Sequence, residues 1–426
     1  MLGPWLTAVW VAAVLAIGAW LAWRASGPRD RPLDAASPGR LFVVFHVLLI
    51  GAGGVALTAS GESGGAGPLL GAYALVAFGI GATLAARRWG VPRSLGPPVT
   101  DRPVQPWAVL ALVVVGLGAV AIIASRNGVP FATADPQATR LAFGGPIFDL
   151  FRWFVPPAAL IALSVALARS GRQAWAVAAL AIGGVVLLEL SLASRVLPLE
   201  LTVAGLLITW WAGRRMPRRG WIALAAAALL LFVGVQLARI GPRGGFSGPA
   251  DVAGFVVERT ASRVFLIQPR TIDHLVASIP ADEPFFAGGT YVRRLATLTG
   301  ADPPPSLGRW IFDRLYPGQV DQGFITPGIL GEAWANFGPF ALLGMALLGV
   351  FAQWLSRFVA ALGPGPADRV FAALLVLALA RTYATSLNGF LATLAAILVW
   401  RLVVTFPDRP DWLRRARLSA THSPGE

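Results

Sequence analysis

The chain has no cysteine and no lysine among its 426 residues, and it has only three histidines. Without cysteine it can form no disulfide framework, thiol nucleophile or cysteine-ligated metal site. The histidines, His46, His274 and His422, lie too far apart in the sequence to indicate a local metal motif, so we expect neither a metal nor another cofactor. Charged residues make up only 13% where a soluble domain carries roughly 25%, which argues against an ordinary soluble protein.

All 35 basic residues are arginine, and the formal net charge is +14. Such an excess can indicate a nucleic-acid partner. Here the arginines lie between long apolar runs, so they indicate membrane topology, and no nucleic-acid partner is expected.

Long apolar segments dominate the chain, in which 56% of residues are hydrophobic. A bilayer core of about 30 Å requires about 20 mostly apolar residues per helix. Eleven segments predict an all-α polytopic membrane protein: 4–23, 41–59, 69–86, 107–125, 147–168, 174–192, 197–213, 221–238, 339–357, 370–386 and 390–405. Arginines follow the first segment rather than precede it, which favours a membrane span over a signal peptide.

Arginine bias predicts one orientation for these spans. Alternate loops hold 21 arginines against seven acids, whereas the other side holds 14 of each. We therefore predict an external N-terminus and a cytoplasmic C-terminus. The predicted organisation is eight spans in 1–240, a large helical loop or cap on the outer side in 241–338, three spans in 339–407, and a cytoplasmic tail in 408–426.

The outer loops carry arginines that suit an anionic ligand. Arg259 and Arg263 are four residues apart and would share one helix face, and no acid lies between residues 259 and 270. Guanidinium groups bind phosphate oxygens well, so several together could hold a diphosphate without a metal. The alternative is that each arginine pairs with one of the equally numerous acids nearby.

The segment from Thr326 to Gly338 is the most distinctive in the chain. Thr326 followed by Pro327 predicts a helix start, and Pro339 predicts a break before the ninth span. Glu332 and Asn336, four residues apart, would share one face of the short helix between them. The Glu332 carboxylate could take a proton from a hydroxyl nucleophile, or it could pair with an arginine and fix the loop.

Several ionisable residues lie within or near the predicted spans, where exposure to lipid is unfavourable. Arg381 lies beyond the midplane of the tenth span, Glu189 lies near the outer end of the sixth, and Asp149 and Arg152 open the fifth. These groups should face a cavity or one another. We consider both a pairing of Glu189 with Arg381 or Arg195 and direct contact with a ligand.

Three short motifs resemble the Wzy-type O-antigen polymerases, which polymerise oligosaccharide repeat units of bacterial surface polysaccharides. The first is Gly128-Val129-Pro130-Phe131 followed by Asp135 and Arg140, and the second is Ser194-Arg195 at the start of a span. The third is the segment 331–338, which resembles the family pattern G-E-x-x-x-N-F-G.

The resemblance implies a metal-independent, membrane-embedded glycosyltransferase of the C type in the bacterial inner membrane. It would transfer a growing glycan from undecaprenyl diphosphate to a newly flipped, lipid-linked repeat unit on the periplasmic side, with a chain-length regulator as a candidate partner. Under this resemblance Glu332 is the expected base, with Asp321 second, and Tyr291 would contact sugar. The expected diphosphate ligands are Arg140, Arg195, Arg263, Arg294 and Arg381.

Two other functions stay open. An O-antigen ligase would have a histidine followed by a small polar residue in the large loop. The late part of this loop reads Asp321-Gln322-Gly323-Phe324, and His274 is followed by Leu275, which favours the polymerase. A flippase or other lipid transporter would have internal repeats with paired broken helices, and we find neither.

Overall fold

The computed structural model describes residues 3–26, 37–90, 104–133, 139, 146–169, 171–192, 196–213, 219–220, 226, 234, 248–299, 306–319, 324–362 and 365–405. Every regular element in these residues is a helix, as predicted. Eight stretches among them are long and apolar enough to cross a membrane, which is the make-up of a polytopic membrane protein. They are α1 (Pro4–Ala25), α2 to α3 (Pro38–Ala59), α4 (Ala66–Trp89), α5 with η2 (Pro106–Ala132), Leu150–Arg169 of α7 (Pro146–Arg169), α8 (Arg172–Ser191), α15 to α16 (Gly328–Ala361) and α18 (Leu387–Val404).

The other three predicted spans have different outcomes. The seventh corresponds to α9 (Val196–Trp211), which has 16 residues, and the tenth to α17 (Pro366–Ala380), which has 15 and leads into the 3₁₀ turn η7 (Arg381–Ala384). Both helices are shorter than the length of about 20 residues that a helix needs to cross a bilayer that is not thinned. The eighth, 221–238, lies outside the described residues apart from two isolated positions.

Several helices begin and end at residues that favour helix boundaries. Proline occupies the first turn of α1, α2, α5 and α17, where its missing N–H leaves no partner unsatisfied. The Ser37 side chain accepts a hydrogen bond from the Arg40 amide at the start of α2. Gly90 and Gly128 end α4 and α5 with positive φ, a conformation that glycine adopts without steric penalty.

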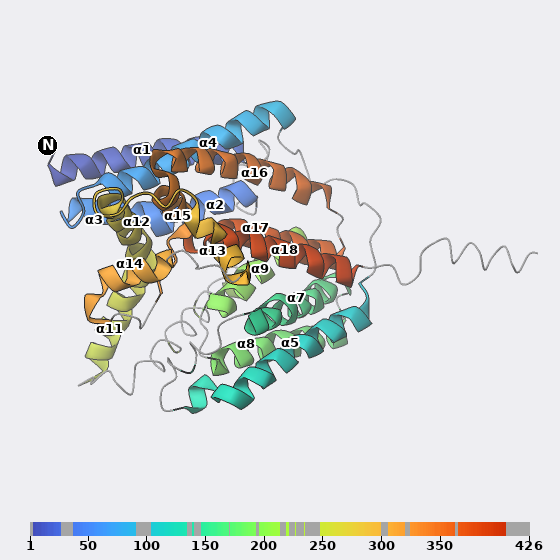
Figure 1. Cartoon of the computed structure of the whole chain (residues 1–426). Helices are drawn as coiled ribbons and strands as arrows, with labels where there is room; N and C mark the ends of the chain where they lie inside the picture. The colour runs from blue at the N-terminus through green and yellow to red at the C-terminus, as the bar shows by residue number, and fades with distance from the viewer. Residues whose placement is uncertain are drawn as a thin grey trace, which may run out of the picture.

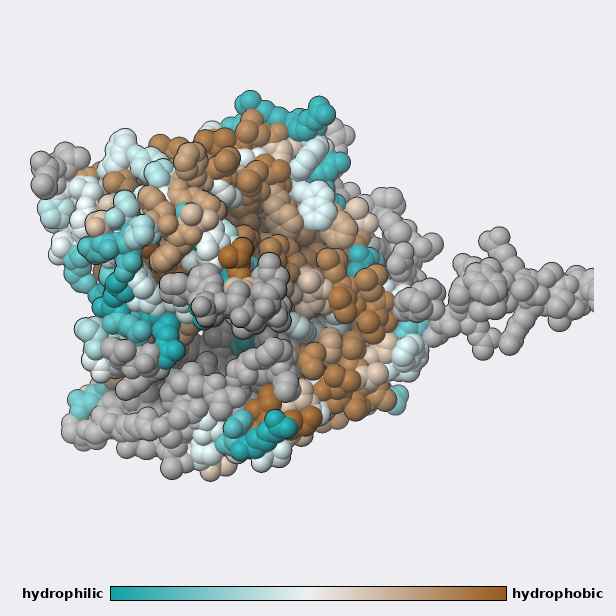
Figure 2. Space-filling model, viewed as in Figure 1, coloured by the Kyte–Doolittle hydropathy of each residue, from teal (hydrophilic) through white to brown (hydrophobic). Residues whose placement is uncertain are grey.

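The long helices form two groups with α17 between them. α1, α4 and α16 (Ala341–Ala361) pack side by side, and α5, α7 and α8 form the second group (Figure 1). α17 contacts α2 (Pro38–His46), α7, α9 and α18, and 12 of its 15 residues are buried. In Figure 2 hydrophobic residues cover the middle of the long helices, and hydrophilic residues lie at the end at which the N-terminus lies and also at the upper and lower edges of the view.

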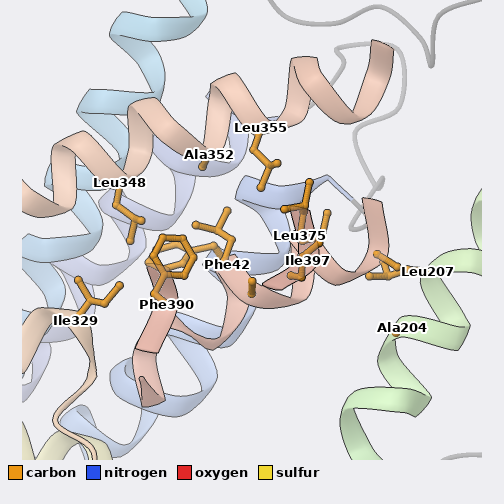
Figure 3. Packing of buried hydrophobic residues seen from close by; sticks show 14 of the residues in the cluster. Phe42, Ala204, Leu207, Ile329, Leu348, Ala352, Leu355, Leu375, Phe390 and Ile397 are labelled. Carbon is orange, nitrogen blue, oxygen red and sulfur yellow. The ribbon is translucent and has the colours of Figure 1, made fainter. Parts of the chain in front are cut away.

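The core between these groups is apolar and contributed by segments far apart in sequence. Phe42 of α2, Leu348 and Leu355 of α16, Leu375 of α17 and Phe390 of α18 all belong to one buried cluster (Figure 3). Figure 3 also shows Ala204 and Leu207 of α9 reaching the same cluster from its far side. The cluster joins the two groups of helices through α17.

Helices α4 and α16 approach each other closely at glycines. A Cβ at Gly81 would overlap the backbone carbonyl of Ala346, and one at Gly349 would overlap that of Phe78. Small residues let apolar helices meet at backbone distance, where dispersion contacts are most numerous. This contact fixes the position of α16 and hence of α15 (Gly328–Phe337), which precedes it.

Short helices between α9 and α15 form what we call the cap. They are α11 (Pro249–Ala261), η4 (Ser262–Leu266), α12 (Ile267–Ser278), α13 (Gly289–Thr299), α14 (Leu307–Leu315) and η5 (Pro317–Gln319). The cap shares a small core with α15, made by Leu275, Ile279, Leu307, Ile311, Ile325 and Ala335. It is tied to the bundle where Asp273 accepts a hydrogen bond from the Gly67 amide at the start of α4, 3.1 Å away. We call this end of the bundle the cap end (left in Figure 1).

His274 lies at the contact between α12 and α14. Its ring is 5.7 Å from that of Trp310, whose other neighbour is the Arg314 guanidinium at 3.9 Å from the ring centre. Burial lowers the pKa of His274 below its ordinary value, and the Arg314 charge lowers it further, whereas Asp282 and Asp273 oppose this. The neutral imidazole is therefore the form that the folded cap favours.

We predict that Gly349→Leu destabilises the bundle, because the new side chain must separate α16 from α4. Overpacking of this kind costs about 1–3 kcal/mol or more. The matched control is Gly344→Leu on the same helix, where a Cβ would meet nothing within 4 Å. Thermal unfolding in detergent should show a lower midpoint for the first variant only. Equal midpoints would contradict the close packing of the two helices.

We also predict that acid weakens the cap through His274. The folded state binds a proton more weakly than the unfolded chain, so stability is lost as pH falls below the ordinary histidine pKa of about 6.5. The wild-type unfolding midpoint should drop more between pH 7.5 and pH 5.5 than that of His274→Gln. Other titrating groups contribute to both proteins and cancel in this difference. A drop of the same size in both proteins would show that His274 contributes nothing.

Candidate functional site

Glu332 lies on α15 and is almost fully buried, with 4% of its surface exposed. Its carboxylate accepts hydrogen bonds from the Leu387 amide at 2.6 Å and from the Thr290 hydroxyl at 3.2 Å. Leu387 is the first residue of α18, where unpaired amides favour a negative charge. Among the described residues, the partners of the Glu332 carboxylate are therefore a backbone amide and a hydroxyl, through which it connects α15 with α13 and α18.

Asn336 is one turn further along α15 and holds the start of α13. Its side-chain amide donates to the Thr290 hydroxyl at 2.6 Å and to the Glu332 carbonyl at 2.7 Å. Its side-chain oxygen accepts from the Gly288 amide at 3.0 Å. Glu332 and Asn336 therefore share one helix face, as predicted, and together they bind the starts of α13 and α18 to α15.

The start of α15 differs from the sequence prediction by one residue. Pro327 is the N-cap in place of Thr326, and the helix begins at Gly328 with φ at +71°. A Cβ at Gly328 would overlap the Tyr383 carbonyl, so α15 and the turn η7 meet at backbone distance. The predicted break is present, because α15 ends at Phe337 and a 3₁₀ turn (Gly338–Phe340) precedes α16.

Tyr291 follows Thr290 in α13 and joins the edge of this cluster. Its ring lies 5.8 Å from that of Phe337, and its carbonyl accepts a hydrogen bond from the Asn388 side chain at 2.8 Å. Burial raises the pKa of the Tyr291 phenol above its ordinary value, and the Glu332 charge raises it further. The phenol stays protonated at neutral pH and can donate a hydrogen bond.

A cavity of about 230 Å³ opens between α7, α9, α17 and α18. At the cap end its wall carries Arg152, Glu200, Arg381 and Thr385. Most of the remaining wall is apolar, made by residues such as Leu160, Leu201, Leu374, Leu377, Ile397 and Trp400. The cavity is therefore amphiphilic, with charge at one end and hydrocarbon along its length.

Arg381 and Glu200 form an ion pair within this cavity. The arginine Nε and Nη1 each lie 3.0 Å from one carboxylate oxygen. From the sequence we considered a pairing of Glu189 with Arg381 or Arg195. The carboxylate on Arg381 is Glu200, and Arg195 lies outside the described residues. The sequence analysis missed Glu200, although an acid in an otherwise apolar span is itself a signal of a polar interior.

The turn between α17 and α18 connects the cavity with the buried cluster. Arg381, Thr385 and Gly389 line the cavity, and Leu387 within the same turn donates its amide to Glu332. Ser386 caps α18 by accepting from the Gly389 amide at 3.1 Å. Glu332 thus holds in place the segment that presents Arg381 to the cavity.

The other predicted site residues are not placed by these contacts. Asp321, Arg140 and Arg195 lie outside the described residues. Arg263 and Arg294 belong to η4 and α13, and their side chains also lie outside the description. Within the described part of the chain, no group of three or more histidine, aspartate or glutamate side chains could hold a metal ion.

Comparisons of this chain with protein-family models, with curated proteins and with solved structures found no match. The fold itself defines the class of protein, which is a helical, polytopic membrane protein with an amphiphilic cavity.

We predict that Glu332→Ala lowers the free energy of unfolding by about 2–6 kcal/mol, because a buried and a partly buried donor lose their acceptor at about 1–3 kcal/mol each. Glu332→Gln should lose about half of that or less, since its amide oxygen can still accept from Leu387. Glu283→Ala is the control, because Glu283 pairs with Arg314 at the surface, where such pairs contribute about 0–1 kcal/mol. Chemical unfolding in detergent measures all three. Equal losses for the alanine and glutamine variants would contradict this role.

Proposed function

We propose that the protein is a membrane-embedded glycosyltransferase of the Wzy type, which polymerises a polysaccharide from repeat units carried on undecaprenyl diphosphate. The observation that carries the proposal is the amphiphilic cavity. Its cap end has the guanidinium groups of Arg152 and Arg381, and its length is apolar. A polyprenyl diphosphate has the same division into an anionic head and a hydrocarbon tail.

The charges of the cavity suit the departure of a diphosphate. In the proposed reaction the hydroxyl oxygen of the acceptor sugar attacks the anomeric carbon of the donor. The bond from that carbon to the diphosphate oxygen breaks, and its electron pair leaves with the diphosphate. Arg381 and Arg152 would stabilise the charge that develops there, which is the largest contribution that a preorganised site makes.

The proton of the acceptor hydroxyl must pass to a base. The resemblance to the polymerase family assigns this role to Glu332, with Asp321 second. In the fold both oxygens of Glu332 accept hydrogen bonds, so it would have to release one of them to act. Tyr291, protonated and beside an aromatic ring, is suited to contact a sugar.

The membrane placement is part of the same proposal. It has eleven spans, with the N-terminus and the cap on the periplasmic side of the bacterial inner membrane and the C-terminus in the cytoplasm. Arginine bias supports this orientation. The substrate would be the undecaprenyl-diphosphate-linked oligosaccharide, membrane lipid would surround the bundle, and a chain-length regulator is a proposed partner.

We predict that the purified protein extends the lipid-linked repeat unit of its organism into a ladder of glycans, and that EDTA does not prevent it. Arg381→Ala should reduce the ladder at least about tenfold, equivalent to about 1.4 kcal/mol of barrier. Arg357→Ala is the control, since this exposed arginine of α16 does not line the cavity. Gel electrophoresis of the glycan resolves the products.

Three results bear on this assignment. A Glu332→Gln variant that is folded but inactive supports Glu332 as the base, whereas an active one leaves it as the residue that positions the turn. No ladder from the wild-type protein, together with movement of the lipid-linked substrate across liposomes, would replace the polymerase with a transporter. A ladder transferred to lipid A core instead of to a repeat unit would indicate a ligase.

A further inference from the structure

The end of the bundle opposite the cap carries arginines on two helices that pack side by side, α4 and α16 (Figure 1). Arg87 and Arg88 lie in the last turn of α4, and Arg357 lies near the end of α16. Neither helix contains an aspartate or a glutamate. The three positive charges are therefore not balanced by any residue of the helix pair itself.

Two hydrogen bonds hold these helix ends together. The carbonyl of Gly90, directly after α4, accepts from the Gln353 side chain at 3.3 Å and from Nη1 of Arg357 at 3.4 Å. Basic side chains in the last turn of a helix often bond its final carbonyls, but here the donors to this carbonyl come from α16. The Arg357 guanidinium is thereby fixed beside the last turn of α4, and it keeps further N–H groups for another acceptor.

We propose that the ends of α4 and α16 form a binding site for the phosphodiester headgroup of an anionic phospholipid, with Arg87, Arg88 and Arg357 as its cations. Guanidinium groups bind phosphate oxygens through paired N–H groups. Basic pockets between membrane helices bind anionic headgroups in other membrane proteins. This inference does not rest on the proposed function, because it concerns the opposite end of the bundle from the site assigned to the reaction.

Aromatic side chains at the same helix ends favour a lipid over a soluble anion. Trp89 follows Arg88 and is 39% exposed, and Trp354, three residues before Arg357, is 46% exposed. Trp354 also stacks on Phe358, with the ring centres 5.3 Å apart. Exposed tryptophans gather where the hydrocarbon of a bilayer meets the headgroups. A phospholipid can place its phosphate on the arginines and its glycerol and upper acyl chains against the indoles, whereas a soluble phosphate uses only the arginines.

The arginine at the end of α18 shows the alternative arrangement, in which the protein supplies the anion. Arg401 lies 2.7 Å from Asp368, and its guanidinium lies 4.4 Å from the centre of the Phe371 ring. An arginine balanced in this way has little to gain from a lipid phosphate. In the part of the chain that the structure describes, none of the three site arginines belongs to an ion pair. Their counter-charge is left for the membrane to provide.

The test measures binding of phosphatidylglycerol to the full-length protein in neutral detergent by native mass spectrometry, with zwitterionic phosphatidylcholine as the comparison. For the wild-type protein we expect the first phosphatidylglycerol to bind at least about tenfold more tightly than phosphatidylcholine. Arg87→Gln/Arg88→Gln should weaken its binding at least about tenfold, since each basic residue near the membrane surface contributes about fivefold to the affinity for anionic lipid. Binding of phosphatidylcholine should stay unchanged.

Arg169→Gln/Arg172→Gln is the matched control. These two arginines are also exposed away from the cap, where α7 ends and α8 begins. The variant removes the same charge but leaves the ends of α4 and α16 intact, so the first phosphatidylglycerol should bind as tightly as it does to the wild-type protein. An equal loss in the two double variants would show a general attraction to basic surface and would overturn the inference.

Two further results would also overturn it. One is a wild-type protein without preference for phosphatidylglycerol over phosphatidylcholine. The other is displacement of phosphatidylglycerol by an equal concentration of glycerol 3-phosphate, which would indicate a site for soluble anions. If the double variant does not fold, Arg88→Gln replaces it, because it removes one charge and leaves the contact between Arg357 and Gly90. Its affinity should be about fivefold lower, and an unchanged affinity would contradict the site.

The outcome is separable from that of the proposed function. None of the three site arginines lines the cavity, so their role in lipid binding holds or fails whether or not the protein makes a glycan ladder.

Discussion

The hydrogen bond from the Leu387 amide to the Glu332 carboxylate connects the two parts of the molecule on which the function depends. On one side of it, α15 carries the cap through Thr290 and Asn336. On the other side, the turn after α17 presents Arg381 to the cavity. The amides at the start of a helix stabilise a nearby negative charge, which here is the Glu332 carboxylate. Burying Glu332 is therefore favourable only while α18 begins at Leu387. The positions of α18, α13 and the cavity wall are thereby set together.

Three charged side chains inside the bundle are held by groups of other segments. Glu332 is held by backbone and hydroxyl donors, Arg381 by Glu200, and Arg401 by Asp368 and the face of Phe371. In an apolar surrounding an unsatisfied polar group is expensive, so such pairs restrict how helices can pack. The apolar contacts between α4 and α16 allow a close approach, but it is the polar pairs that specify the register of α15, α17 and α18.

The features that could be predicted best from the sequence are those that depend on residues close together in the chain. Eight of the eleven predicted apolar segments coincide with stretches of spanning length, and Pro339 predicted the break between α15 and α16, because hydropathy and proline act locally. The partners of Arg381 and Glu332 could not be predicted, since Glu200 and Leu387 come to them only through packing of α9 and α18. The segment 370–386 is read as one span, yet α17 ends at Ala380, because the turn that follows is held by α15.

Arg381 is fixed by its ion pair with Glu200 and is still accessible from the cavity, because its side chain stays partly exposed there. Arg401 is covered by an aromatic ring and lies outside the cavity, so its pair can only stabilise the fold. Arg381 has a comparable partner but keeps a larger exposed surface within the cavity. Glu200 balances the charge of Arg381, so the apolar surrounding tolerates a guanidinium that is still accessible from the cavity.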